Sequence, residues 1–522
     1  MSMTWLANGD KSAAWAHHTW EEFATLQDKH CHLVILPLHG LADHGMALPL
    51  DIEEVVGSEL LRRAITTTAP SLRLRVLPPL RFVLAPTPAS FLGIDPETAH
   101  DLVHEIASGV QAAGFRKLVF WNTSPWNEEF IDVASRDVRI ALDLQTFVIN
   151  LNGLGLDFHP SGTGRTALQA IGASLCGISP ASESRPADVT DPDFRPGQWR
   201  QPPPVDPDPS QDAPALIGKA AGHLARLLAE IDSKCPPGRI VFGPQPVKAP
   251  SASLHAASAM RFDQPWPAHR RHYLPALTRA GLEAWPEKAA TLVILPTGAI
   301  EQHGLHLPVG VDAILGQAWL DAALPKLDPG TRVLVAPPIT FGKSNEHIGF
   351  PGTVSVSART FRRLLLATTR NLHALGFRFF GVLNTHGGNS AVIVYTLREI
   401  QSMPEVRAGM ISSGYTPVQS EVEREFGFHA GEWETSLMMA VTEGLVKPER
   451  AVCEYPARPE DPGELRPENA PAIFSWLTSD ISRSGTMGDA TAANEEKGRR
   501  WLAESSSALA RRISELARSA QD

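Results

Sequence analysis

The sequence predicts an α/β protein built from two tandem copies of one fold, each with a mainly parallel sheet. Three observations predict this class. The chain has 522 residues, which is too long for one ordinary hydrophobic core. In its second half, short apolar runs alternate with longer segments of helical periodicity, as in parallel sheets covered by helices on both faces. The first half also repeats the second at a nearly constant spacing.

The expected strands and helices of the second half alternate along the chain. Apolar runs bounded by Gly, Pro or Asn predict strands at 291–295, 332–336 and 378–383. The spacing of apolar residues predicts helices at 358–375, 390–403 and 494–520. Sites in parallel sheets form beyond the carboxyl ends of the strands, so the polar residues that follow these runs are expected to form a site.

The repeat consists of short matching sequence motifs at two offsets. His44 aligns with His303, and each follows a similar apolar segment, at an offset of 259 residues. Asn127 aligns with Asn389 behind a shared Gly-Phe-Arg word, at an offset of 262. A unit this long indicates a duplicated domain rather than a solenoid repeat. The predicted boundaries are a degenerate N-terminal domain at 28–235, a linker at 236–265 and a catalytic domain at 266–522.

The first copy lacks most of the polar residues that the second copy carries. Its counterparts of Glu301, Asp312, His386 and Glu434 are Ala42, Glu53, Ser124 and, in a weaker alignment, Gly164. We therefore expect the first copy to be catalytically silent, because too few ligands remain to hold a metal pair. One alternative stays open, in which the first copy uses other groups, namely His39, Asp43, His44 and Asp51.

Composition excludes several classes of partner. The net charge is −10 and no Lys/Arg cluster is dense enough to follow a phosphate backbone, so no nucleic acid is expected to bind. No apolar run reaches the ~20 residues that span a bilayer, and the N-terminus does not resemble a signal peptide. We expect a cytoplasmic protein with no membrane partner. Its four cysteines are widely scattered, so we expect buried free thiols.

Three segments of the second half carry the chemistry. They are residues 301–308 with Asp312 beyond them, residues 385–390, and residues 429–436. Together they supply carboxylates and imidazoles separated by Gly and Pro, and the first two follow predicted strands. This is the composition of a hydrolytic metal site.

These segments, with residues 346–353 and 488–498, resemble in order the motifs of the creatininase family, the creatinine amidohydrolase-like enzymes. The resemblance covers about residues 285–500 and implies a three-layer α/β/α fold. One position departs from creatininase itself. Where that enzyme has a metal-binding Glu two residues after the histidine of the third motif, this chain has Gly388.

The resemblance also implies roles for particular residues. Asp312 would bridge two divalent ions, with Glu301 and His386 on one ion and His303 on the other. Glu434 is the candidate for the carboxylate that Gly388 does not supply. Imidazole and carboxylate ligands are compatible with Zn²⁺, Mn²⁺ or Fe²⁺.

Two further residues are catalytic candidates. By family position, His429 would protonate the departing nitrogen. Glu346, with His347 beside it, would orient the substrate or a metal ligand; the alternative is that this pair only fixes its loop. His306 and Glu432 are open in the same way, and Trp433 is expected to pack in a core rather than to contact substrate.

The implied function is metal-dependent hydrolysis of a non-peptide C–N bond in a small amide, cyclic amide or formamide. The absence of Trp from residues 406–428 argues against creatinine itself, because creatininase places ring-flanking tryptophans there. A peptidase-like family member is one alternative, and a non-catalytic scaffold or binding protein is another. Family members assemble from identical subunits, so we expect the two copies to form an intrachain pseudo-dimer, within a homo-oligomer, joined by an extensive apolar interface.

Overall fold

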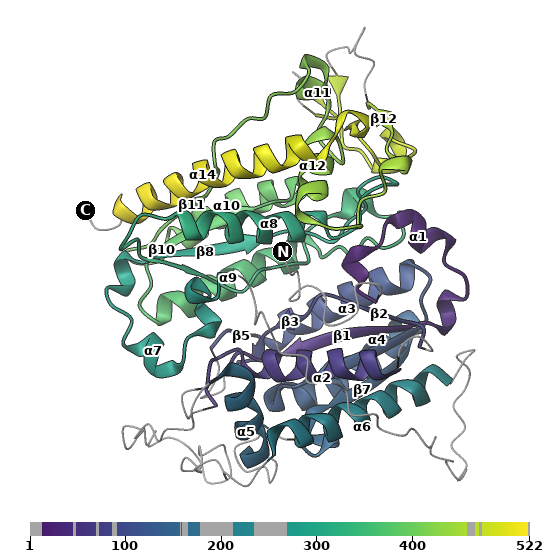
Figure 1. Ribbon diagram of the computed structural model, residues 1–522, viewed down its shortest axis with the longest axis vertical. Helices are drawn as coiled ribbons and strands as arrows, with labels where there is room; N and C mark the ends of the chain where they lie inside the picture. Colours follow the sequence, from purple (N-terminus) through teal and green to yellow (C-terminus); the bar gives the residue numbers. More distant parts are fainter. Residues whose placement is uncertain are drawn as a thin grey trace.

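The structure is a computed structural model, and it describes residues 13–44, 48–68, 72–85, 91–156, 158, 165–177, 212–233, 269–456, 465–468 and 472–519. The predicted linker at 236–265 and Gly164 lie outside these residues. The chain forms two α/β halves, one in purple and blue and the other in teal to yellow (Figure 1). Each half is built around its own parallel sheet.

The sheet of the first half has the strand order β2-β1-β6-β7, with β3 also paired to β1. Its strands are β1 (Leu33–His39), β2 (Leu74–Val76), β3 (Leu80–Arg81), β6 (Lys117–Asn122) and β7 (Gln145–Asn150). One face packs against α2 (Ile52–Thr68), α5 (Arg165–Cys176) and α6 (Ala213–Ser233). The other face packs against α3 (Pro96–Ala112) and α4 (Glu128–Leu142).

The sheet of the second half has the corresponding order β11-β10-β8-β9, also parallel throughout. Its strands are β8 (Leu292–Thr297), β9 (Val333–Val335), β10 (Phe379–Asn384) and β11 (Arg407–Met410). Helices α9 (Ala358–Ala374) and α10 (Ser390–Ile400) cover one face. Helices α8 (Val311–Ala323) and α14 (Glu495–Ser519) cover the other, and α12 (Glu432–Val441) packs against both of them. The predicted three-layer α/β/α architecture is confirmed.

The remaining α-helices and strands are short. They are the helices α1 (Trp20–Thr25), α7 (Arg279–Glu283), α11 (Glu421–Phe426) and α13 (Thr478–Ile481), and the strands β4 (Val83–Leu84), β5 (Gly93–Ile94), β12 (Cys453–Glu454), β13 (Leu465–Arg466), β14 (Ala472–Ile473) and β15 (Gly488–Asp489).

The strand registers reproduce both offsets of the sequence repeat. In the first half Leu33 of β1 lies opposite Lys117 of β6. In the second half Leu292 of β8 lies opposite Phe379 of β10, 259 and 262 residues further along. The duplication is therefore seen in the pairing of the strands as well as in the sequence words.

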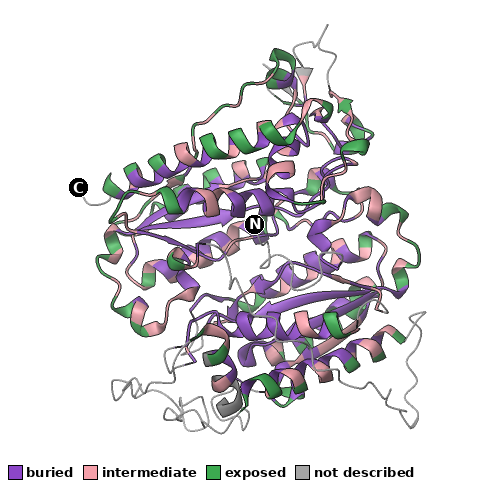
Figure 2. Cartoon of the chain, viewed as in Figure 1, coloured by how far each residue is buried: buried purple, intermediate pink, exposed green. Residues whose placement is uncertain are grey.

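The two halves share a hydrophobic core. One cluster of buried residues contains Val103 of α3 and Phe361 of α9, together with residues of both sheets. At its rim, Asp101 pairs with Arg363 at 2.9 Å, and Glu105 accepts a hydrogen bond from the backbone of Ser357. Buried residues follow both sheets and the helices between them (Figure 2). The expected apolar interface between the copies is confirmed.

The expectation of buried free thiols is wrong. Cys31 is disulfide-bonded, Cys453 is free but exposed, and Cys176 is free and half-buried. The scattered spacing of the cysteines along the chain gave no signal for this disulfide. Among the helices of the described residues, none is long and apolar enough to span a membrane.

Candidate metal centre

Polar residues from three parts of the second half meet beyond the carboxyl ends of β8 and β10. The loop after β8 carries Glu301 and His303, and Asp312 lies in the first turn of α8. His386 follows β10, and Glu434 lies in the first turn of α12. The side-chain amide of Asn384, the last residue of β10, donates to the carbonyl of His386 at 2.6 Å and so holds the turn after the strand.

Asp312 stands between two imidazoles. Its Oδ2 lies 3.4 Å from His386 Nδ1, while its Oδ1 lies 3.5 Å from His303 Nε2. Glu301 Oε1 is 3.2 Å from the same nitrogen of His386, and Glu434 Oε2 is 3.9 Å from His303 Nε2. The structure thus brings all five predicted ligands together, and each oxygen of Asp312 faces a different half of the group.

Backbone carbonyls fix which nitrogen of each imidazole is available to a cation. His386 Nε2 lies 2.9 Å from the carbonyl of Lys343, so this nitrogen carries the proton and donates. His303 Nδ1 donates to the carbonyl of Glu301 at 3.0 Å. His386 Nδ1 and His303 Nε2 therefore face Asp312 and become available to a cation once it displaces their protons, the arrangement that second-shell carbonyls give to metal-binding histidines.

The group fits a pair of divalent cations. Glu301 Oε2, His303 Nε2 and Asp312 Oδ2 are buried without any hydrogen-bond partner. Leaving such atoms unsatisfied is costly, and buried polar groups almost always have partners. Cations bound by carboxylate and imidazole would satisfy all three atoms at once.

Burial and neighbouring charges shift the pKa values of the acids and bases of the group in different directions. Burial raises the pKa of Glu301, but the imidazoles of His347 and His386 outweigh it and hold this pKa well below its usual value. Burial and the charge of Glu301 raise the pKa of Asp312. Burial lowers the pKa of His303, yet the Asp312 carboxylate raises it to about 9. For His386, burial is likewise outweighed by Glu301, and its pKa rises to about 10. Burial raises the pKa of Glu434 to about 7.

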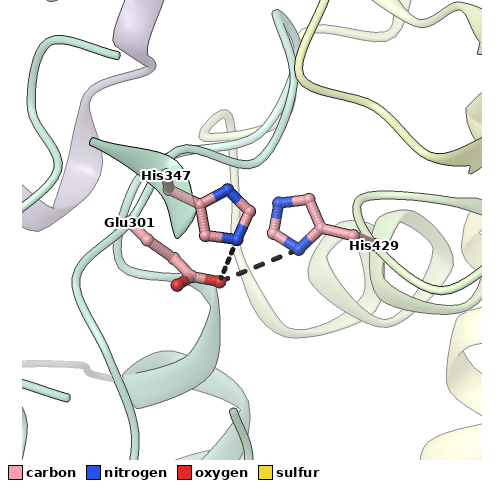
Figure 3. A group of neighbouring side chains, drawn as sticks. All are labelled: Glu301, His347 and His429. Atoms are coloured by element: carbon pink, nitrogen blue, oxygen red, sulfur yellow. Dashed lines mark ion pairs between the residues drawn. The ribbon is translucent and has the colours of Figure 1, made fainter. Parts of the chain in front are cut away.

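Two further histidines converge on Glu301 (Figure 3). Its Oε1 lies 3.4 Å from His347 Nε2 and 3.7 Å from His429 Nδ1. The other nitrogen of His429, Nε2, lies 2.8 Å from the carbonyl of Gln302 and 3.0 Å from its side-chain amide nitrogen; we assign its proton to the shorter contact with the carbonyl, which leaves Nδ1 unprotonated toward the group. Burial and the charges of His303 and His347 hold the pKa of His429 well below its usual value. His429 is therefore a neutral base at the edge of the site.

Gln302 organises this second cluster, and sequence reasoning missed it. Its side-chain amide donates to His347 Nδ1 at 2.9 Å and to the carbonyl of Gly485 at 3.0 Å. His347 also contacts the hydroxyl of Thr478 at 2.7 Å. The only signal in the sequence was the position of Gln302 between Glu301 and His303.

Glu346 occupies the space beside Gly388. Its Oε1 lies 3.8 Å from His386 Nε2, and its Oε2 accepts from Lys343 Nζ at 2.7 Å. A Cβ atom at position 388 would lie 2.5 Å from His386 Nε2, 2.6 Å from the Lys343 carbonyl and in contact with Glu346 Oε1. A side chain at position 388 would therefore collide with the Glu346 carboxylate, which lies near Nε2 of His386, the nitrogen that does not face Asp312.

Other candidates have structural partners. His306 Nε2 contacts the Thr435 hydroxyl at 2.7 Å, and burial lowers the pKa of this histidine to about 3. Glu432 pairs with Lys497. The ring of Trp433 packs against Trp501, with centroids 5.4 Å apart, as the core interpretation predicts.

A different tryptophan stands beside the site. The ring of Trp476 lies edge-on to His347 at 6.3 Å and 5.9 Å from the ring of Phe428. An aromatic group thus reaches the site from downstream of the segment that lacks Trp.

The first half keeps a remnant of the same arrangement. His44 Nε2 lies 2.8 Å from Glu53 Oε1, and the other oxygen of Glu53 accepts from the backbone of Gly40. Of the alternative set, His39 contacts Thr123, Asp43 pairs with Arg279 and Asp51 pairs with Arg270. Among the described residues, groups of three potential ligands occur only in the second half.

The family model for creatinine amidohydrolase, named Creatininase, matches residues 16–178 and 276–513. The chain therefore belongs to the creatininase family, and both halves fall within the match.

Several curated proteins are similar to part of the chain. The mycofactocin precursor peptide peptidase of Mycolicibacterium smegmatis is 30% identical over 226 residues, 42% of this chain and 84% of the relative. The creatinine amidohydrolase of Pseudomonas putida is 29% identical over 248 residues, 43% of this chain and 90% of the relative. The 3-dehydro-scyllo-inosose hydrolase of Thermotoga maritima is 31% identical over 179 residues, 32% of this chain and 56% of the relative. These relationships support a hydrolase.

Among solved structures, one named Creatininase Mn is 27% identical, with a TM-score of 0.39, and the similarity covers 47% of this chain and 98% of that one. A putative creatinine amidohydrolase from Bacteroides fragilis is also 27% identical, with a TM-score of 0.38, over 43% of this chain and 89% of that one.

Proposed function

We propose that the second half is a metal-dependent hydrolase that would hold two divalent cations, with Asp312 as a ligand that both could share. One observation carries the proposal. The two oxygens of Asp312 face Nε2 of His303 and Nδ1 of His386, and three buried ligand atoms of this group have no hydrogen-bond partner. Such a site would lower the pKa of a bound water and polarise the substrate carbonyl that this water attacks.

Glu301 and His386 would hold one cation, and His303 and Glu434 the other. The candidate ions are Zn²⁺, Mn²⁺ and Fe²⁺, since all three accept a mixed set of imidazole and carboxylate ligands. Lys343 and Glu301 contribute backbone carbonyls that keep the two imidazoles in place.

His429 would move the proton. Its Nε2–H donates to the Gln302 carbonyl, so Nδ1 is the atom that would act. It would take a proton from the attacking water and then give that proton to the departing nitrogen. Glu346, held by Lys343 beside His386, would orient that imidazole or the substrate.

The proposed substrate is a small amide, cyclic amide or formamide with a non-peptide C–N bond. Trp476 offers a ring beside His347 against which a planar group could pack. A peptide substrate is the second candidate, because a relative that is 30% identical is named as a peptide peptidase. A scaffold without activity fits less well, since the second half retains all five proposed ligands, four of them buried.

The first test is the metal content of protein purified without chelator or added metal. We expect close to two ions per chain. Asp312→Asn should lose both, because it removes the carboxylate that both cations share. Its matched control is Glu53→Gln, at the equivalent position of the first half, which should leave the metal content unchanged.

Three other results of this measurement would each change the proposed function. Near-zero metal in the unaltered chain, before and after reloading with zinc, would favour the scaffold. Nearly four ions would mean that the first half binds metal as well. Two ions, followed by hydrolysis of peptides but not of a panel of small amides, would select the second candidate.

A further inference from the structure

Each half begins with an arm that starts on its own sheet. We call residues 13–25 the first arm and residues 272–283 the second arm. In the first arm, Ala14 forms a parallel bridge to Val76 at the end of β2. In the second, Tyr273 forms the same bridge to Val335 at the end of β9. These pairs are related by the offset of 259.

Both arms then cross to the opposite half. The backbone nitrogens of Val309 and Gly310 donate to the carbonyls of His18 and Ala16, at 2.8 and 3.0 Å. The nitrogens of Leu50 and Asp51 donate to the carbonyls of Leu277 and Pro275, at 3.1 and 3.0 Å. All four bonds obey the same offset, so the arms are exchanged reciprocally between the halves.

The first arm reaches the loop that holds the metal ligands. Val309 and Gly310 lie between His303 and Asp312, and the carbonyl of Val309 accepts from the backbone of Glu301 at 2.9 Å. Hydrogen bonds therefore run from the arm through Val309 to a ligand. The approach is close, since a Cβ atom at position 310 would lie 2.5 Å from the Ala16 carbonyl oxygen.

Side chains of the first arm hold two more segments of the site. Trp15 Nε1 donates to the carbonyl of Gly352 at 2.8 Å, in the loop that follows His347. Trp20 Nε1 donates to the carbonyl of Ser484 at 3.0 Å, next to the Gly485 that Gln302 contacts. Figure 1 shows α1 of this arm, in purple, beside the loops of the second half.

Within the part of the chain that the structure describes, the second arm contacts no group of three potential metal ligands. It reaches residues 49–51 of the first half, where Asp51 pairs with Arg270 just ahead of the arm, and Asp43 pairs with Arg279 of the arm. The equivalent of Glu301 in this half is Ala42, which is buried in an apolar cluster. The first arm thus contacts the loop that carries the proposed ligands, and the second arm contacts the equivalent loop of the first half, which lacks them.

We propose that the first arm is a positioning element for the metal centre, through which the silent half holds the ligand loop of the second half in place. This rests on the proposed metal-dependent function. It gives the first half a role that does not require any ligand of its own. Trp15 and Trp20 act as positioning residues, because they touch the loops of the site and no reacting atom.

The test compares equivalent positions of the two arms in the full-length protein. Trp20→Phe removes the bond to Ser484, and Arg279→Met, at the position 259 residues later, removes the pair with Asp43. Zinc affinity is measured by competition with a chromophoric chelator, and unfolding temperature by calorimetry. We expect Trp20→Phe to weaken zinc binding by about tenfold, at the lower end of what outer-shell changes cost. Arg279→Met should change zinc affinity by less than about twofold.

A second variant of the arm, Trp15→Phe, removes the bond to Gly352 and should weaken zinc binding in the same direction. If both arm variants lower the unfolding temperature while zinc affinity stays at the wild-type value, the arm is only structural and the proposal is wrong. If Arg279→Met weakens zinc binding as much as Trp20→Phe does, general loosening explains both and the proposal also fails. Unaltered protein that binds no zinc would overturn the proposed function together with the role of the arm.

Discussion

Zinc binding to the metal-free protein is expected to release about two protons per chain at pH 7.5. The protons come from His303 and His386, whose pKa values of about 9 and about 10 lie far above that of an ordinary imidazole. Burial lowers both values, but Asp312 and Glu301 outweigh it. A cation must displace these protons, because a protonated nitrogen has no lone pair to offer.

The magnitude follows from the two pKa values. At pH 7.5, His303 is about 97% protonated and His386 more than about 99% protonated, whereas a histidine with a pKa of ~6.5 is only about one tenth protonated. Two displaced protons make zinc affinity rise by about 100-fold for each pH unit between about pH 8 and 8.5, where Glu434, with a pKa of about 7, is already ionised. The slope should flatten as the pH passes through 9 and then 10, because the metal-free histidines then lose their protons unaided.

Calorimetric titration with zinc in several buffers of different ionisation enthalpy measures the number of protons released. His306→Gln is the control, since burial already holds the pKa of this nearby histidine at about 3 and it has no proton to lose. It should release the same number as the unaltered chain. Release of fewer than about 0.5 protons at pH 7.5 would refute the assigned charge pattern around Asp312.

Three other substitutions have defined outcomes. His429→Gln should keep the metal content by elemental analysis but lower kcat by about 10²- to 10⁴-fold, as for a lost general acid or base; loss of metal would make His429 a ligand. His44→Ala should leave metal content and kcat unchanged, and a complete loss of activity would contradict a silent first half. Gly388→Ala should lower the free energy of unfolding in urea by about 1–3 kcal/mol, because the new Cβ lies 2.5 Å from His386 Nε2 and displaces Glu346; unchanged stability would contradict this placement of Glu346.

The fold was largely predictable because the relevant signals are local. The expected strand at 378–383 is observed as Phe379–Asn384, and the expected helix at 358–375 as Ala358–Ala374. The repeated sequence motifs predicted offsets of 259 and 262 residues, and the paired strands of the two sheets show the same two offsets. The five expected ligands also meet, because strand ends in a parallel sheet meet at one edge.

Features made by contacts between distant segments were not predictable. Glu301, His347 and His429 come from three loops, and only the fold shows that Gln302 lies among them. The first arm has no motif of its own, and its bonds to Val309 and Gly310 come from backbone atoms that any residue offers.

The exchange of arms within one chain has a consequence for behaviour on dilution. If the two halves were separate subunits, each would lose the other's arm once the protein concentration fell below their dissociation constant. Joined in one chain, each arm meets its partner at an effective concentration of about millimolar, whatever the amount of protein in solution. A zinc site braced in this way should keep the same affinity per chain from micromolar down to nanomolar protein.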